Sequence, residues 1–192
     1  MKKPISLTHF LCSIVNFSET ELELFTSLFE KEKMTKKHFF AKKGEYSKQI
    51  AFVETGILRA FYSNEKGEEY NKTFFTSNQF VGAYSSLVSQ KQNLIDIQCL
   101  TDCVLWVANF ENITRLYYDY PKIERLSRLL AEQFFVNKEK REIELVTLEA
   151  KQRYEIFLKE HKELKNQIAQ YHIASYLGIT PTQLSRIRSR KE

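Results

Sequence analysis

Glycine and proline are scarce in this chain, which has five glycines and three prolines among 192 residues. Hydrophobic residues make up 43% and aromatic residues 14%, which is enough to fill a core and excludes a disordered chain. With so few glycines and prolines, each one marks a place where the backbone turns. The stretch IAQYHIASYLGITPTQLSRIRSR at residues 168–190 stands out, because Gly178 and Pro181 lie three positions apart and three arginines follow.

Cysteine is also scarce, with Cys12, Cys99 and Cys103 as the three examples. They form neither a disulfide framework nor a pair of CxxC motifs, and the four histidines are scattered. Cys99 and Cys103 are four positions apart, but two ligands are too few for a structural metal site. We therefore expect no bound metal, and buried free thiols at two or more of these positions.

Long apolar runs are absent, since no eighteen consecutive residues are apolar. The N-terminal stretch KKPISLTHFLCSIVNF is broken by His9, Ser13 and Asn16, and it lacks a small-residue cleavage pattern. These two observations predict a cytoplasmic protein that does not enter a membrane.

Positive charge is confined to the end of the chain. Residues 151–192 contain nine lysines and arginines but four acidic residues, and the remaining 20 basic and 20 acidic residues of the totals 29 and 24 balance each other in residues 1–150. This distribution is expected if the C-terminal end meets a polyanion.

The first two thirds of the chain predict a helix followed by a β-structure. Ser18 and Glu21 fit a capping box, and the apolar spacing after them predicts a helix over residues 19–30. Residues 36–110 are short segments rich in aromatic and β-branched residues, separated by turn residues, which predicts an antiparallel β-roll of roughly eight strands. The stretch SNEKGEEY (63–70) is its clearest hairpin. The predicted strand segments are 39–40, 50–53, 57–62, 70–75, 95–100 and 104–107.

A long helix is predicted to follow. Residues 110–120 resemble a short helix ended by Pro121, and no glycine or proline interrupts residues 122–177. The apolar residues on related faces of this long helix are Ile123, Leu126, Leu130, Phe134, Leu145 and Leu148. This stripe could pack on the roll or pair with a second copy of the helix, and we favour a homodimer because the domain after it requires a twin.

Residues 168–190 have the pattern of a DNA-binding helix-turn-helix. Ala174 is the small residue inside the first helix, and Gly178 tolerates positive φ in the turn. Thr180 is the N-cap of the second helix, with Pro181 at its first position and Gln183 completing a capping box. The inward apolar residues are Ile173, Leu177, Ile179, Leu184 and Ile187.

The outward face of the second helix carries side chains suited to the major groove. Thr182, Gln183, Ser185 and Arg186 are the predicted base-reading residues, because glutamine can pair with adenine, arginine with guanine and a threonine methyl with thymine. The predicted phosphate contacts are Arg188, Arg190, Lys191, Gln170 and Tyr171. The alternative is a helical hairpin whose charged face is merely solvated.

At this point the chain resembles the Crp/Fnr family of transcription regulators, over essentially its whole length. The residues that carry the resemblance are KQRYEIFL (151–158), IASYLGITPTQLSRIR (173–188) and, in the roll, VETGILRAFY (53–62). It is most similar to the short Bacteroidetes-type members. The resemblance implies an α+β chain with a β-roll of the cyclic-nucleotide-binding, jelly-roll type at residues 1–120, a dimer helix at 121–148 and a helix-turn-helix domain at 149–192.

The effector cassette departs from the family pattern. Cyclic-AMP-binding members have the form F-x-G-E-L and an Arg-Ser-Ala about ten residues later, whereas this chain has Ala83 after Gly82 and Asn93 near the arginine position. A buried phosphate would lose its countercharge and a ribose hydroxyl its acceptor, each at a cost of about 1–3 kcal/mol. We therefore do not expect cyclic AMP binding. The iron–sulfur sensing of the fumarate–nitrate regulator requires four cysteines, and this chain has three, so we do not expect it here.

Other residues could form a neutral effector pocket or simply pack. The candidates are Arg59, Gly82, Tyr84, Ser85 and Ser86. The effector, if there is one, is not identified by the sequence.

The sequence thus predicts a dimeric, sequence-specific DNA-binding regulator without a catalytic site or cofactor. Its expected partners are double-stranded DNA, a second copy and RNA polymerase, and no β-wing is expected after the motif. A metalloenzyme built on the roll is disfavoured, because His38 is the one histidine between residues 36 and 110. A sensor or adaptor whose helical tail binds an acidic protein is the alternative.

Overall fold

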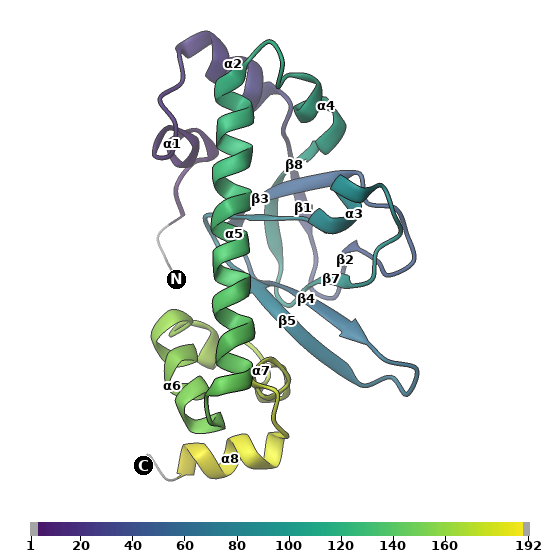
Figure 1. The fold of residues 1–192 in the computed structure, drawn as a ribbon, viewed down its shortest axis with the longest axis vertical. Coiled ribbons are helices and arrows are strands. Elements are labelled where there is room, and N and C mark those ends of the chain that lie inside the picture. The colour runs from purple at the N-terminus through teal and green to yellow at the C-terminus, as the bar shows by residue number, and fades with distance from the viewer. Residues whose placement is uncertain (1–3, 190–192) are drawn as a thin grey trace. The chain divides into compact units, whose positions relative to one another are not determined.

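The computed structural model describes residues 4–189, which fall into two compact units. Within these residues, the roll unit comprises 4–60 and 74–131, and the head unit comprises 61–73 and 132–189. Figure 1 shows the sheets and helices along the chain.

The roll is built from two antiparallel four-stranded sheets, so the predicted β-roll is confirmed. One sheet has the order β1 (Glu30–Met34), β8 (Cys103–Asn109), β3 (Gln49–Thr55) and β6 (Gln79–Val81). The other has the order β2 (Phe39–Ala41), β7 (Asp96–Cys99), β4 (Leu58–Ser63) and β5 (Glu69–Phe75). All six predicted strand segments are strands, and β1 and β6 are additional.

Successive side chains of the first sheet point alternately into two cores, one on each face of the sheet. Phe52 on β3 lies opposite Trp106 on β8, and their neighbours Val53 and Leu105 are fully buried in the core between the sheets. Phe52 belongs to a second core on the outer face of this sheet. Both faces are therefore covered, which is why β3 is almost continuously apolar.

Helices of the roll unit supply the second core. They are α1 (Leu7–Cys12), α2 (Glu19–Ser27), α4 (Phe110–Arg115) and the first turns of α5 (Pro121–Thr147). Ile123 and Leu126 of α5 are completely buried there. The first part of the predicted apolar stripe thus packs on the roll.

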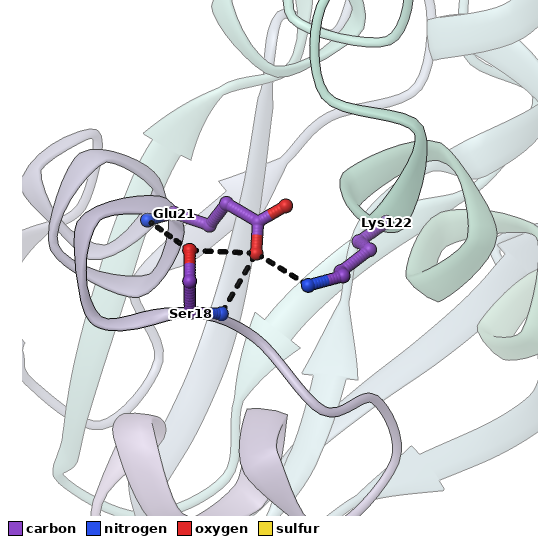
Figure 2. Close-up of polar contacts among 3 residues, drawn as sticks. All are labelled: Ser18, Glu21 and Lys122. Carbon is purple, nitrogen blue, oxygen red and sulfur yellow. Dashed lines mark hydrogen bonds and ion pairs between the residues drawn. The ribbon is translucent and has the colours of Figure 1, made fainter.

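The predicted capping box at the start of α2 is present (Figure 2). The Ser18 N–H donates to Glu21 Oε2 at 2.7 Å, and the Glu21 N–H donates to Ser18 Oγ at 3.3 Å. Lys122 Nζ of α5 lies 2.8 Å from the same carboxylate oxygen. The predicted end of this helix at residue 30 is wrong, because Glu30 begins β1 and pairs with Val107.

Gly56 lies in the turn between β3 and β4 and is packed closely against Cys103. Gly56 has φ +107°, and a Cβ there would lie 2.5 Å from Cys103 Sγ and 2.7 Å from the Asp102 carbonyl oxygen. Cys99 and Cys103 are buried free thiols, as expected, and Cys12 is an exposed one. The position of Gly56 therefore accepts no side chain without movement of the backbone.

The head unit contains the helical end of the chain and a β-hairpin. Its helices after α5 are α6 (Ala150–Glu160), the short 3₁₀ helix η1 (Leu164–Asn166), α7 (Gln170–Leu177) and α8 (Pro181–Ser189). The hairpin joins β4 to β5, and its turn is closed by Asn64 Oδ1, which accepts from the N–H groups of Lys66 and Glu68. The hairpin predicted at residues 63–70 is confirmed.

Within residues 4–189, none of the helices is long and apolar enough to span a membrane. In the same part of the chain, no three His, Cys, Asp or Glu side chains are grouped so that they could hold a metal ion.

Candidate nucleic-acid interface

The helices α7 and α8 are joined by a tight turn at Gly178. This glycine has φ +67° and ends α7, and the N–H of Ile179 donates to the Ala174 carbonyl at 3.0 Å. A Cβ on Gly178 would meet Leu145 Cδ2 at 3.6 Å, which is an ordinary contact. The backbone conformation, and not a lack of space, is therefore what requires glycine here.

A capping box begins α8. The Gln183 N–H donates to Thr180 Oγ1 at 3.2 Å, and Gln183 Oε1 accepts from the Thr180 N–H at 2.9 Å. Pro181 occupies the first helical position, where a missing N–H costs nothing. Of the predicted inward set, Ile173, Leu177 and Leu184 are at most 1% exposed, whereas Ile179 and Ile187 are half-buried. Ala174 is completely buried.

The outward side of α8 is exposed and carries no acidic residue. Thr182, Ser185 and Arg186 are exposed, whereas Arg188 is half-buried. Gln183 is exposed as well, but its carbonyl oxygen already serves the capping box. Arg190 and Lys191 lie outside the described residues.

The N-terminal end of α7 carries the two other predicted contacts. Tyr171 is 56% exposed, and its ring lies 4.1 Å from that of His172, centroid to centroid. Gln170 is half-buried and donates from Nε2 to the Lys165 carbonyl at 3.0 Å. Tyr171 is thus accessible to a partner, while the amide nitrogen of Gln170 is engaged within the head unit.

Two arginines that sequence reasoning missed hold the C-terminal end of α7. Arg153 of α6 donates from Nε to the Leu177 carbonyl at 3.0 Å and from Nη1 to the Leu148 carbonyl. Arg141 of α5 donates to the Tyr176 carbonyl, and its guanidinium carbon lies 4.0 Å from the centroid of the Tyr176 ring. The signal for Arg153 was its place in the KQRYEIFL motif, whereas Arg141 has no distinguishing neighbours in the sequence.

Burial shifts the pKa values of Arg141 and Tyr176. Burial lowers the pKa of Arg141, although Tyr176 and Glu144 oppose this change. Burial also raises the pKa of Tyr176, against the effect of Arg141. The guanidinium carbon of Arg141 lies over the Tyr176 ring, which is the geometry of a cation–π contact.

Aromatic side chains of α6 complete the support. Tyr154 and Phe157 are 2% and 1% exposed, and the rings of Phe157 and Tyr176 lie 5.7 Å apart. Lys140 of α5 forms an ion pair with Glu160 of α6 at 2.5 Å. The motif KQRYEIFL therefore builds the frame behind the helix-turn-helix.

The predicted effector cassette lies in the roll unit, between β6 and β7. Gly82 and Ala83 lead from β6 into α3 (Tyr84–Ser89), and Ala83 is 3% exposed. Asn93, near the expected arginine position, is 4% exposed and donates from Nδ2 to Ser47 Oγ at 2.7 Å. Its N–H donates to the Glu45 carbonyl and its carbonyl accepts from the Gly44 N–H, both at 2.8 Å.

The five candidate pocket residues do not form one group. Ser86 is buried, accepts from the Ser47 N–H at 3.2 Å and donates to the Lys91 carbonyl at 2.5 Å. Arg59 is 4% exposed and donates from Nε and Nη2 to Gln98 Oε1 at 3.2 and 2.8 Å. Ser85 and Tyr84 are exposed, and a Cβ added at Gly82 would lie 3.4 Å from both Ile50 Cγ1 and Leu87 Cδ1.

Tyr84 and Ser86 line an open cleft of about 730 Å³, whose other lining residues include Tyr46, Phe110 and Tyr117. The Tyr84 ring packs edge-on against Phe110, at a centroid distance of 5.9 Å. Arg59 does not line this cleft. The cleft is lined by a cationic residue of another segment, Lys48, and this lysine is exposed.

Comparisons with known proteins agree with this architecture. Residues 31–120 match the family model of the cyclic nucleotide-binding domain. The chain is 22% identical, over 94% of its length and 74% of that protein, to the anaerobic regulatory protein of Haemophilus influenzae.

Solved structures show the same fold. FixK2 from Bradyrhizobium japonicum has a TM-score of 0.76 at 16% identity, with 84% of this chain and 83% of that chain covered. CLP, described as a c-di-GMP responsive global regulator of Xanthomonas campestris, has a TM-score of 0.73 at 15% identity, with 90% and 91% covered. A regulator of the Crp/Fnr family from Eubacterium rectale has a TM-score of 0.71 at 14% identity, with 91% and 83% covered.

The fold is thus an antiparallel roll of the cyclic-nucleotide-binding type, followed by a long helix and C-terminal helices. With these matches, the resemblance of the chain to the Crp/Fnr family of transcription regulators is confirmed.

Proposed function

We propose that this chain is a homodimeric regulator that binds double-stranded DNA in a sequence-specific way, with α8 as its reading helix. The observation that carries the proposal is the outward face of α8, where Thr182, Ser185 and Arg186 are exposed on a helix without acidic residues. This helix is fixed by a capping box and by the buried Leu184. Rigid presentation of such side chains is what major-groove readout needs.

In this proposal the side chains of the head unit have separate roles. Arg186 donates to guanine, Thr182 and Ser185 contact neighbouring base edges, and Arg188 and Arg190 bind phosphates, together with Tyr171. Gln183 and Gln170 support the two helices through the hydrogen bonds that they make within the head unit.

The second copy is proposed to pack along α5. Phe135, Val136, Ile143 and Val146 are between 55% and 87% exposed, and their spacing places them on one side of this helix. Pairing of two such stripes would bury them and bring two reading helices to half-sites about 34 Å apart, as a pseudo-palindromic target requires. Such a dimer would act on RNA polymerase at a promoter, in the cytoplasm.

Cyclic AMP is not the effector in this proposal, and no cofactor is required. Ala83 offers no carboxylate for a ribose hydroxyl, and Asn93 offers no charge for a phosphate. The amide of Asn93 is moreover bonded to Ser47. CLP is described as responsive to c-di-GMP, and in this chain the cationic residue that lines the cleft is the exposed Lys48.

The test is selection of bound sequences from a random duplex pool, with and without cyclic AMP. We expect enrichment of the same two-fold symmetric site in both conditions. Arg186→Ala should relax the preference at one position of each half-site by about 1–3 kcal/mol, whereas Arg188→Ala should weaken binding to all sequences. The matched control is Arg115→Ala, which removes an exposed arginine of the roll unit.

The alternative function is an adaptor whose helical tail binds an acidic protein. The same selection assay distinguishes it, because an adaptor would enrich no duplex sequence. Duplex binding must weaken log-linearly with salt concentration, because bound phosphates release counterions. Absence of enrichment for the wild type in both conditions would contradict the proposed function.

A further inference from the structure

The strand β5 lies at the edge of its sheet, so one side of its backbone has no strand partner. On the hairpin, the Asn71 N–H donates to Ser175 Oγ of α7 at 2.9 Å, and Ser175 Oγ donates to the Glu69 carbonyl at 2.7 Å. In a strand, the N–H of one residue and the C=O two residues before it point to the same side. The hydroxyl of Ser175 thus takes the place of a neighbouring strand.

The side chain of Asn71 makes a second connection to α7. Asn71 is 6% exposed and donates from Nδ2 to the His172 carbonyl at 3.0 Å, with His172 Nδ1 at 3.4 Å from the same nitrogen. His172 is 5% exposed, and it lies one turn before Ser175 on the same side of the helix. We call the contacts of Asn71 and Glu69 with His172 and Ser175 the clasp.

The clasp joins segments about one hundred residues apart in the sequence, and both belong to the head unit. The helix α7 has eight residues, and among the described side chains none caps its N-terminus. A helix of this length is marginal on its own and depends on tertiary contacts. The clasp is such a contact, on the side of α7 that carries Ser175.

We propose that Asn71 and Ser175 are positioning residues for DNA binding, which hold α7, and through the Gly178 turn α8, in the arrangement that meets DNA. This inference rests on the proposed function. Neither residue touches DNA; they act by ordering the helices before binding, so that less conformational freedom is lost on the duplex.

The experiment combines hydrogen exchange with DNA affinity, on the full-length chain. Ser175→Ala removes the bridging hydroxyl and Ser175→Thr keeps it. Asn71→Ala removes the side-chain hydrogen bond to the His172 carbonyl and leaves the Asn71 N–H to Ser175. Ser27→Ala is the matched control, since Ser27 is a helical serine of the roll unit whose hydroxyl donates to the Leu24 carbonyl. The readouts are amide exchange of the peptide covering residues 69–73 and the Kd for the duplex selected by the wild type.

We expect faster exchange of residues 69–73 and a three- to tenfold higher Kd for Ser175→Ala and Asn71→Ala, the size that loss of one or two hydrogen bonds gives. Ser175→Thr and Ser27→Ala should match the wild type in both readouts.

Faster exchange with an unchanged Kd would overturn the positioning role, because the clasp would then be structural only. Unchanged exchange in both clasp variants would overturn the clasp itself. If the wild type selects no duplex, the proposed function fails, and the exchange difference still reports separately whether the clasp forms.

Discussion

Arg153 donates from Nε to the carbonyl oxygen of Leu177 at 3.0 Å. Through Nη1 it also reaches the carbonyl of Leu148, so that one side chain joins the last turn of α7 to the residue that follows α5. The four final carbonyls of a helix have no partner within it, and a guanidinium with its fork of donors can serve two helix ends at once.

We expect Arg153→Ala to lower the free energy of unfolding of the head unit by about 2 kcal/mol, because it leaves carbonyl groups unsatisfied. Arg153→Lys should recover a part of this loss, since an ammonium group cannot reach both ends. Urea unfolding checks the prediction, with Arg115→Ala as the exposed control, expected to change stability by less than about 0.5 kcal/mol. Equal effects of Arg153→Ala and Arg115→Ala would contradict it.

A second prediction concerns the acid stability of the roll unit. Lys122 and the Ser18 groups lower the pKa of Glu21 from 4.5 to about 2 (Figure 2). Because the pKa is lower in the folded state, the contribution of this carboxylate is complete above pH 4.5 and is lost as the pH falls towards 2. We expect thermal unfolding from pH 6 to 2 to show a smaller loss of stability for Glu21→Gln than for the wild type.

Glutamine at position 21 can still form the capping box, so this variant removes the charge alone. Glu23→Gln, two positions further along α2, is the matched control and should keep the wild-type profile. Identical pH profiles of Glu21→Gln and the wild type would show that the pair with Lys122 does not contribute.

The capping box of α8 leads to a third prediction. Bidentate pairing with adenine needs the carbonyl oxygen of Gln183, which already accepts from the Thr180 N–H. We expect Gln183→Ala to destabilise the head unit by about 1 kcal/mol, through loss of the cap, and to leave the selected base sequence unchanged. Chemical denaturation and duplex selection measure the two effects. Relaxed preference at an adenine would mean that the box opens on DNA and that glutamine reads this base.

The exposed stripe of α5 leads to a fourth prediction. Val146→Glu or Ile143→Glu should convert a dimer to a monomer, because a charge would be buried in the paired interface. Sedimentation equilibrium measures the mass, and Tyr118→Glu is the control, since Tyr118 is 94% exposed and lies off the stripe. A dimer that survives both substitutions would place the interface elsewhere.

The sequence predicted elements whose apolar pattern is regular, and it missed those without one. The strand β1 reads EKEKM, with no alternation that indicates a strand, yet it pairs with β8 from Glu30 to Met34. This edge strand forms because its backbone pairs with β8. Residue propensities along the sequence do not show which segments will pair in this way. For the same reason the helix before it was predicted three residues too long.

The long helix α5 has apolar residues at helical spacing along its length, but its first turns are buried and its later turns are exposed. Ile123 and Leu126 of the predicted stripe are buried against the roll, whereas the large exposed side chains further along include Phe135 and Val146, which the stripe did not contain. A helical period cannot tell which neighbour each turn will meet. The helix-turn-helix was predictable in more detail, because its glycine, cap and apolar positions are all local requirements.

Asn93, near the arginine position of the effector cassette, is hydrogen-bonded to Ser47 of a neighbouring loop. Ser47 is hydrogen-bonded to both Asn93 and Ser86, so the polar groups of these two residues are partnered within the protein. Such an intramolecular hydrogen bond forms at a high effective concentration, because both groups belong to the same chain. Any group that bonds to the amide of Asn93 must therefore first replace its hydrogen bond to Ser47.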